Sequence, residues 1–414
     1  MLRLRPMNRN SRFPTAFLTT AHVIVSALAI SILMPAIAHA QKETIVYSFE
    51  TQGGDGVGPI GGVITDPKGN IYGTTSAGGT NNKGTVFEIS GGKERILWNF
   101  GGPGDGAQPY GNLVRDAAGH LFGTTLTGGS LGLGTVFEIT GLNKETVLVS
   151  FVETNGALPF GGLVRDRAGN LYGVTSSGGT RGLGLIFEVS SSGTFSILYQ
   201  FTGAPDGAIP EGSLLLDSKG NLFGLTAAGG TGKQSFCTSG CGTVFEYSAS
   251  KLESVLYSFT GGADGATPAG GAFLINDAKG NLFGTTTAGG TVNSACPTTG
   301  CGVVFEVSGT SEKVLYAFQG QPNNNDGANP YSGLIRDGKG NLYGTTINGG
   351  INGHGVLYEI TTAGAEKILH SFPAQVGDGV LPLSSIVPDG NGGGYGTTEG
   401  GGQFGGGTVY DIAP

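Results

Sequence analysis

One segment of roughly 50 residues occurs seven times along this chain, and no other feature of the sequence limits the fold as strongly. The unit carries three landmarks: Gly-Asn-Leu-Tyr-Gly-Thr-Thr, as in Gly340–Thr346; Gly-Thr-Val-Phe-Glu-Ile, as in Gly84–Ile89; and Asp-Gly-x-x-Pro, as in Asp55–Pro59. The third repeat has Asn155 in place of the Asp. The repeats begin near residues 55, 105, 155, 206, 264, 326 and 378.

Each repeat reads as four short strands joined by glycine-rich turns. In the third repeat the strands are expected at residues 161–166, 170–175, 184–189 and 197–201. Glycine supplies 81 of the 414 residues without the Gly-X-Y period of collagen, and no window after residue 40 has the 3.6-residue apolar period of a helix. Four strands in each of seven repeats predict an all-β fold, a seven-bladed β-propeller.

The two ends of the repeat region predict a closed ring. The seventh repeat ends with its third strand at Ile412, whereas residues 44–49 form a fourth strand that has no repeat of its own. We expect this N-terminal strand to complete the last blade, because the exchange buries both edges of that sheet. A linear solenoid would need capping repeats instead.

Aromatic residues recur at three fixed positions, one in each of the second, third and fourth strands. These positions hold 21 of the 36 aromatic residues. A sugar-stacking array is one interpretation, but recurrence in all seven repeats favours packing between blades.

The unit GGLVRDxxGNLYGTTxxGG…GTVFEI resembles the GloVer tandem repeat of bacterial "choice-of-anchor" proteins, and the resemblance covers essentially all of residues 41–414. It implies an exported repeat region joined to varied C-terminal anchors. No evident anchor follows the seventh repeat in this sequence. The resemblance implies no activity and therefore no site residues.

Residues 1–40 have the pattern of a bacterial export signal. Arginines at positions 3, 5, 9 and 12 precede an apolar stretch from about Ala16 to Ala38, and Ala38-His39-Ala40 has the small-x-small form of a cleavage site. We expect cleavage after Ala40, a secreted or periplasmic location for residues 41–414, and no membrane span after signal removal. The alternative is an uncleaved membrane anchor.

Charge limits the partners of the cleaved chain. Loss of residues 1–40 removes four Arg and no acidic residue, which leaves 18 basic and 30 acidic side chains and a net charge of −12. Nucleic acid binding depends on Lys and Arg, so we expect no nucleic acid partner. We expect a monomer whose ligand or partner is extracellular or part of the cell envelope.

Carboxylates recur in two sets, and both are expected to form turns. The Asp-Gly aspartates could alternatively form a calcium-binding rim, an interpretation that we do not favour. The histidines after residue 40 are His120, His354 and His370, which show no ligand spacing, so we predict no metal site and no cofactor. The first set of aspartates lies between the first and second strands: Asp66, Asp116, Asp166, Asp217, Asp277, Asp337 and Asp389. The second set is Asp55, Asp105, Asp206, Asp264, Asp326 and Asp378.

Function is expected where the repeats differ. The loops before the first strand and after the second strand emerge on one face, because alternate strands run antiparallel. On that face the residue after the loop proline varies: Ile60, Tyr110, Phe160, Glu211, Ala269, Tyr331 and Leu383. We predict that Tyr110, Phe160, Glu211 and Tyr331 form a ligand-binding surface near the channel mouth.

Cysteine occurs only in repeats 4 and 5, in equivalent loops. An even number of cysteines in an exported chain predicts disulfides Cys237–Cys241 and Cys296–Cys301. A metal site with four thiolates is the alternative. We expect the disulfides to fix loop shape on the variable face.

No catalytic constellation is evident, so we expect a non-enzymatic binding or scaffold propeller, with a carbohydrate or envelope component as ligand. One alternative is a propeller hydrolase or lactonase with a metal in the central channel. That enzyme needs several acids and a His there, and only Glu211 places an acid near the channel-facing strands. A purely structural cell-envelope repeat protein is the second alternative.

Overall fold

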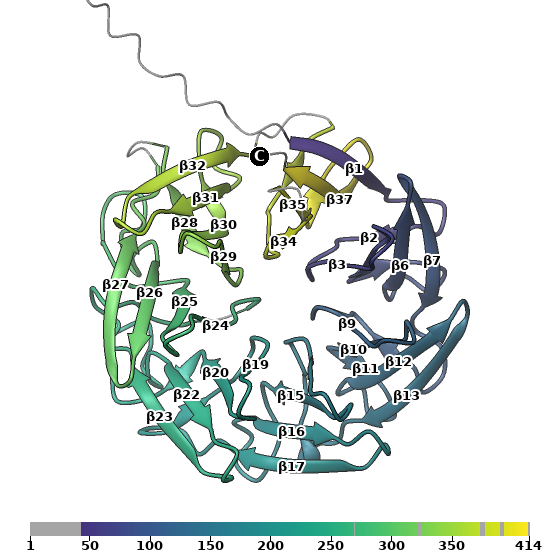
Figure 1. The fold of residues 1–414 in the computed structure, drawn as a ribbon, viewed down its shortest axis with the longest axis horizontal. Coiled ribbons are helices and arrows are strands. Elements are labelled where there is room, and N and C mark those ends of the chain that lie inside the picture. The colour runs from purple at the N-terminus through teal and green to yellow at the C-terminus, as the bar shows by residue number, and fades with distance from the viewer. Residues whose placement is uncertain (1–42, 269, 322–324, 373–376, 390–392, 413–414) are drawn as a thin grey trace, which may run out of the picture. The chain divides into compact units, whose positions relative to one another are not determined.

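Seven blades, built mainly of antiparallel strands, are arranged around a central axis in the computed structural model (Figure 1), which describes residues 43–268, 270–321, 325–372, 377–389 and 393–412. The predicted seven-bladed propeller is confirmed. The predicted export signal lies outside the described residues.

The first three blades each contain four strands, ordered from the channel outward. Blade 1 consists of β3 (Ile64–Thr65), β4 (Ile71–Thr75), β6 (Thr85–Ser90) and β7 (Lys93–Asn99). Blade 2 consists of β9 (Val114–Arg115), β10 (Leu121–Thr125), β12 (Thr135–Gly141) and β13 (Lys144–Ser150). Blade 3 consists of β14 (Val164–Arg165), β15 (Leu171–Thr175), β16 (Leu185–Val189) and β17 (Phe195–Gln200).

Blades 4 to 6 repeat this order. Blade 4 consists of β19 (Leu215–Leu216), β20 (Leu222–Thr226), β22 (Thr243–Tyr247) and β23 (Glu253–Ser258). Blade 5 consists of β24 (Ile275–Asn276), β25 (Leu282–Thr286), β26 (Val303–Ser308) and β27 (Ser311–Ala317). Blade 6 consists of β29 (Ile335–Arg336), β30 (Leu342–Gly349), β31 (Val356–Ile360) and β32 (Glu366–Ser371). The innermost strands are shorter than the sequence predicts.

Blade 7 joins the two ends of the described chain. It contains β34 (Val387–Pro388), β35 (Gly394–Thr398) and β37 (Gly405–Ile412), and its outer strand is β1 (Glu43–Glu50). Strand β1 pairs antiparallel with β37, with Glu43 opposite Ile412. The prediction that the N-terminal strand completes the last blade is confirmed.

The Asp-Gly segments form additional short ladders that the sequence analysis did not predict. Each pairs with residues that follow the second strand of its repeat. The pairs are β2 (Gly56–Val57) with β5 (Ala77–Gly78), β8 (Gly106–Ala107) with β11 (Thr127–Gly128), β18 (Gly207–Ala208) with β21 (Ala228–Gly229), β28 (Gly327–Pro330) with β30, and β33 (Gly379–Val380) with β36 (Gly400–Gly401). Single bridges replace them in repeats 3 and 5, at Ala157–Ser177 and Ala266–Ala288. The two kinds of loop therefore share one face, as predicted.

A glycine in the second strand of each blade makes room for an aromatic ring. A Cβ on Gly73 would lie 2.5 Å from Cζ of Phe87, the ring on the neighbouring strand. Ring contacts between blades follow the same repetition: Phe49 meets Phe87 at 5.1 Å between centroids, and Phe372 meets Tyr410 at 5.4 Å. The prediction that these aromatic residues pack between blades is confirmed.

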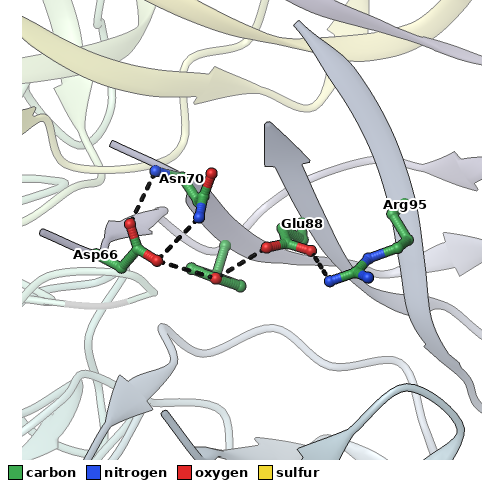
Figure 2. A network of polar contacts seen from close by, with 5 residues as sticks. Asp66, Asn70, Glu88 and Arg95 are labelled. Carbon is green, nitrogen blue, oxygen red and sulfur yellow. Dashed lines mark hydrogen bonds and ion pairs between the residues drawn. The ribbon is translucent and has the colours of Figure 1, made fainter. Parts of the chain in front are cut away.

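Aspartates of the first set hold the turn between the first two strands (Figure 2). Asp66 accepts hydrogen bonds from the backbone and the side chain of Asn70, and from the hydroxyl of Tyr72. Tyr72 also donates to Glu88, which pairs with Arg95 on the outer strand. The turn-forming prediction is confirmed, and the network extends across all four strands of the blade.

Helical structure is confined to a single turn, η1 (Glu153–Asn155), within the residues that the structure describes. None of the described residues belongs to a helix with the length and apolar character that crossing a membrane requires.

Candidate functional site

Glycine pairs bring the innermost segments of neighbouring blades into backbone contact. A Cβ on Gly111 would lie 2.5 Å from the backbone nitrogen of Gly162, and one on Gly161 would lie 2.5 Å from the carbonyl oxygen of Gly212. Any side chain at these positions would push the blades apart. The residue that precedes each of these glycines is therefore held at a fixed place around the channel.

Those preceding residues converge on one narrow hollow at the channel mouth. Five of the seven variable positions line it: Ile60, Tyr110, Phe160, Tyr331 and Leu383. Ala269 lies outside the described residues. The structure thus gathers side chains from repeats that are far apart in sequence.

Three of the four predicted ligand-binding residues are aromatic and partly buried here. The rings of Tyr110 and Phe160 touch, with centroids 5.1 Å apart and planes tilted by 49°. Tyr331 lies over Gly270, whose φ of +71° and missing side chain leave the space that its ring occupies. The cluster combines two adjoining rings with a third ring that covers backbone.

Glu211 is the fourth predicted residue and the acidic member of the cluster. Its carboxylate accepts a hydrogen bond of 2.9 Å from the backbone N–H of Gly270, the glycine beneath Tyr331. Burial raises the pKa of Glu211, and this hydrogen bond opposes the rise. Glu211 and Tyr331 are therefore linked through one glycine. We call Tyr110, Phe160, Glu211 and Tyr331 the channel-mouth cluster.

Glu399 belongs to the same neighbourhood and was missed by the sequence analysis. Burial raises the pKa of Tyr110, and the charge of Glu399 raises it further. Burial and the nearby Glu211, Tyr110 and Glu399 also raise the pKa of Tyr331. The other repeats have no acidic residue after the second strand, where Glu399 stands, so a comparison of the repeats could have identified it.

A second polar arrangement recurs at the contacts between blades, and we call it the junction triad. An aromatic N–H or O–H on one outer strand donates to the Asp of the following Asp-Gly motif, and a Glu on the next outer strand lies beside that Asp. For example, Tyr199 donates to Asp206 at 2.9 Å, and the charge of Asp206 raises the pKa of Glu253 further after burial has raised it. The triads are Tyr47–Asp55–Glu94, Trp98–Asp105–Glu145, Tyr199–Asp206–Glu253, Tyr257–Asp264–Glu312 and Tyr316–Asp326–Glu366.

Two junctions depart from this pattern. Between blades 2 and 3 the three positions hold Val149, Asn155 and Phe195. Between blades 6 and 7 they hold His370, Asp378 and Glu43, whose potential ligand atoms lie within 4.8 Å of one another.

Both predicted disulfides are present. Cys237 pairs with Cys241 at a Cα separation of 5.0 Å, and Cys296 pairs with Cys301 at 5.4 Å. The sulfurs of Cys237 and Cys241 pack against Gly261, in the loop that leads to blade 5. The first disulfide therefore takes part in packing between blades as well as in its own loop.

Solved structures with this fold include two extracellular domains. One belongs to the hybrid two component system BT3049 of B. thetaiotaomicron, with 14% identity, a TM-score of 0.54, and 90% of this chain and 41% of that chain covered. The other belongs to the one component system BT4673 of the same organism, with 12% identity, a TM-score of 0.53, and 89% and 40% covered. This chain thus spans about two fifths of those structures, and the likeness shows the fold.

A gluconolactonase from Xanthomonas campestris, XC5397, is also similar, with 14% identity and a TM-score of 0.41 over 72% of this chain and 82% of that one. That similarity is too low to bear on function. No curated protein matches the chain.

The repeat itself defines the relationship to a family. The Gloeobacter/Verrucomicrobia repeat matches residues 36–237, 164–321 and 232–410, which together span the propeller from the N-terminal strand to the last blade. This chain has seven copies of the unit, with glycines where the inner segments of neighbouring blades meet. It belongs to the Gloeobacter/Verrucomicrobia (GloVer) repeat family.

Proposed function

We propose that this chain is an exported, non-enzymatic binding propeller that recognises a carbohydrate at the channel-mouth cluster. The observation that carries the proposal is the convergence of Tyr110, Phe160 and Tyr331 on one hollow, at positions where the repeats differ. Residues that only hold blades together recur in nearly every repeat, whereas these side chains do not.

The chemistry of the cluster suits a sugar. Partly buried aromatic rings offer flat apolar faces for the C–H faces of a pyranose ring. The carboxylate of Glu211 is fixed by the N–H of Gly270 and retains further acceptor sites for ligand hydroxyl groups. The cavity volume of the hollow is only about 20 Å³, so a sugar would lie across its mouth, on the aromatic rings, and not inside it. An uncharged sugar is favoured over an anionic one because Glu211 and Glu399 are both close to Tyr331.

Export is part of the proposal. The predicted signal of residues 1–40 supports it, and so do two disulfides, which persist in oxidising compartments.

The test is retention of the purified chain on immobilised neutral polysaccharides, peptidoglycan and envelope extracts. We expect retention on one carbohydrate class. For that ligand, Tyr110→Ala and Phe160→Ala should each weaken binding by about tenfold, the change that ~1.4 kcal/mol produces. Glu211→Gln should weaken it less, because the amide oxygen can still accept from Gly270.

Phe404→Ala is the matched control, since Phe404 is an exposed ring beside β1 on the outer side of blade 7. It should bind like the unchanged chain. Absence of retention on every carbohydrate would contradict the proposed ligand class. Retention that all three cluster variants preserve would place the site elsewhere.

A further inference from the structure

The contact between blades 6 and 7 is where the ring closes, and its polar residues come from three segments. His370 lies on β32, Asp378 lies in the loop before β33, and Glu43 begins β1. Figure 1 shows β32 and β1 as consecutive outer strands on either side of this junction. A ligand bound by all three residues would link the N-terminal strand to blade 6.

One imidazole and two carboxyl groups lie close together at this junction. Nε2 of His370 lies within ion-pair distance of Oε2 of Glu43, at 3.1 Å, and Oε1 of Glu43 has no hydrogen-bond partner. The Glu43 side chain is only 7% exposed, so water does not satisfy it. Buried acceptors without donors are costly unless a positive group lies between them.

The other junctions show what is different here. At the next junction round the ring, Tyr47 donates its hydroxyl hydrogen to Asp55, and at four other junctions a Tyr or Trp does the same. His370 occupies the position of that donor, but a neutral imidazole can offer a nitrogen lone pair. The Glu of each of the five other triads also has an oxygen without a hydrogen-bond partner, so the imidazole is what distinguishes the closure junction.

We infer that Glu43, His370 and Asp378 form a binding site for a divalent transition-metal ion, which links the N-terminal strand to blade 6 and so stabilises the closed ring. Among the described residues, these three form the one His–carboxylate group close enough to share an ion. One imidazole and two carboxylates suit Zn²⁺, which takes nitrogen and oxygen ligands in tetrahedral sites. Ca²⁺ prefers six to eight oxygen ligands, more than these residues supply.

The sequence analysis predicted no metal ligands because the histidines lack ligand spacing. The three residues are 8 and more than 300 positions apart, and only the closure of the ring brings them together.

The experiment measures Zn²⁺ binding to the purified chain after treatment with EDTA. We expect saturable binding of one Zn²⁺ per chain by calorimetry and a rise in the melting temperature. Mg²⁺ and Ca²⁺ should produce no comparable rise.

His370→Tyr is the decisive variant, because Tyr occupies this position at four other junctions and should preserve the fold. It should remove both the stoichiometric Zn²⁺ binding and the thermal shift. The matched control is His120→Asn, which also replaces a His by the residue that most other repeats have. His120 lies near Asp116 and Glu138 but is more exposed, and its replacement should leave Zn²⁺ binding intact.

Tyr316→His tests the geometry in the opposite direction, since Tyr316 contacts both Asp326 and Glu366. In a folded variant the stoichiometry should rise to two. The inference is overturned if Zn²⁺ does not bind the unchanged chain, if His370→Tyr retains the ion, or if folded Tyr316→His still binds only one.

Discussion

The junction between blades 2 and 3 and the junction between blades 4 and 5 make the same contact with different chemistry. In the latter, Tyr257 donates to Asp264, and Glu312 lies beside that Asp. In the former, Val149 and Phe195 replace the Tyr and the Glu, and the Phe195 ring stacks on Phe187 at 5.8 Å.

The comparison separates two roles of the Asp-Gly aspartate. Asn155 still accepts a hydrogen bond from the backbone N–H of Val152, so the turn does not need a negative charge. The charge is present only where a Tyr, Trp or His faces it and a carboxyl group lies next to it. The three residues thus change as one unit, and that unit belongs to the contact between blades.

The rings common to both kinds of junction should give the largest effects. Phe49→Ala should lower the free energy of unfolding by about 3–5 kcal/mol, because Phe49 is fully buried between blades 7 and 1. Phe151→Ala should cost less, since Phe195 lies beside Phe151 and can fill part of the cavity. Urea unfolding of both variants measures the difference. Equal losses of unfolding free energy would show that Phe195 does not fill the cavity left by Phe151→Ala.

Converting the apolar junction one residue at a time should be the next most damaging change. Phe195→Glu places a carboxylate in an apolar contact and should cost about 2–4 kcal/mol at neutral pH. The triple variant Val149→Tyr, Asn155→Asp and Phe195→Glu should recover much of that loss, because it completes the triad. A triple variant no more stable than Phe195→Glu would contradict the description of the triad as a unit.

Disulfides reinforce two of the polar junctions. Replacing Cys237 and Cys241 together with Ser should cost about 2 kcal/mol, as expected for a closed loop this short. The pair Cys296 and Cys301 should behave alike. Thermal unfolding with and without a reducing agent provides the measurement, and reduction should lower the melting temperature of each double variant less than that of the unchanged chain, because only one disulfide remains.

The pH dependence should be the smallest effect, and its sign follows from the carboxyl pairs. Burial, and then the adjacent Asp, raises the pKa of Glu145, Glu253 and Glu312 to about 7, from about 4.3 in an unfolded chain. The folded state therefore binds more protons, so this stability is complete below pH ~4.3 and is lost as the pH rises through 7. The turn aspartate Asp66 acts oppositely, because hydrogen bonds lower its pKa.

The melting temperature should consequently be highest in mildly acidic solution and fall by a few degrees towards pH 8.5. Glu253→Gln should flatten the decline, whereas Phe195→Leu, at the junction without carboxyl groups, should leave its slope unchanged. A melting temperature that rises from pH 6 to pH 8.5 would be incompatible with proton-sharing pairs.

Much of the fold was predictable because a repeat is an internal comparison: seven copies give the strands, the turns and the missing outer strand that β1 supplies. The position of the channel-mouth cluster was predictable for the same reason, since residues at one position of the repeat meet around one axis. The junction triads were not found, because their members belong to three different segments of two blades. Aligning Val149, Asn155 and Phe195 against the other repeats would have revealed that they change together.

The use of β1 as the outer strand of blade 7 also determines when that blade can be completed. Strand β1 leaves the ribosome before every other strand of the propeller, yet its partner β37 is the last to be made. Until β37 has been made, β1 has no strand in its own blade with which to pair. Unpaired strands of this kind readily join other chains, and charged residues discourage such pairing. Glu43 and Glu50 stand at the two ends of β1 and provide that protection until the last blade is complete.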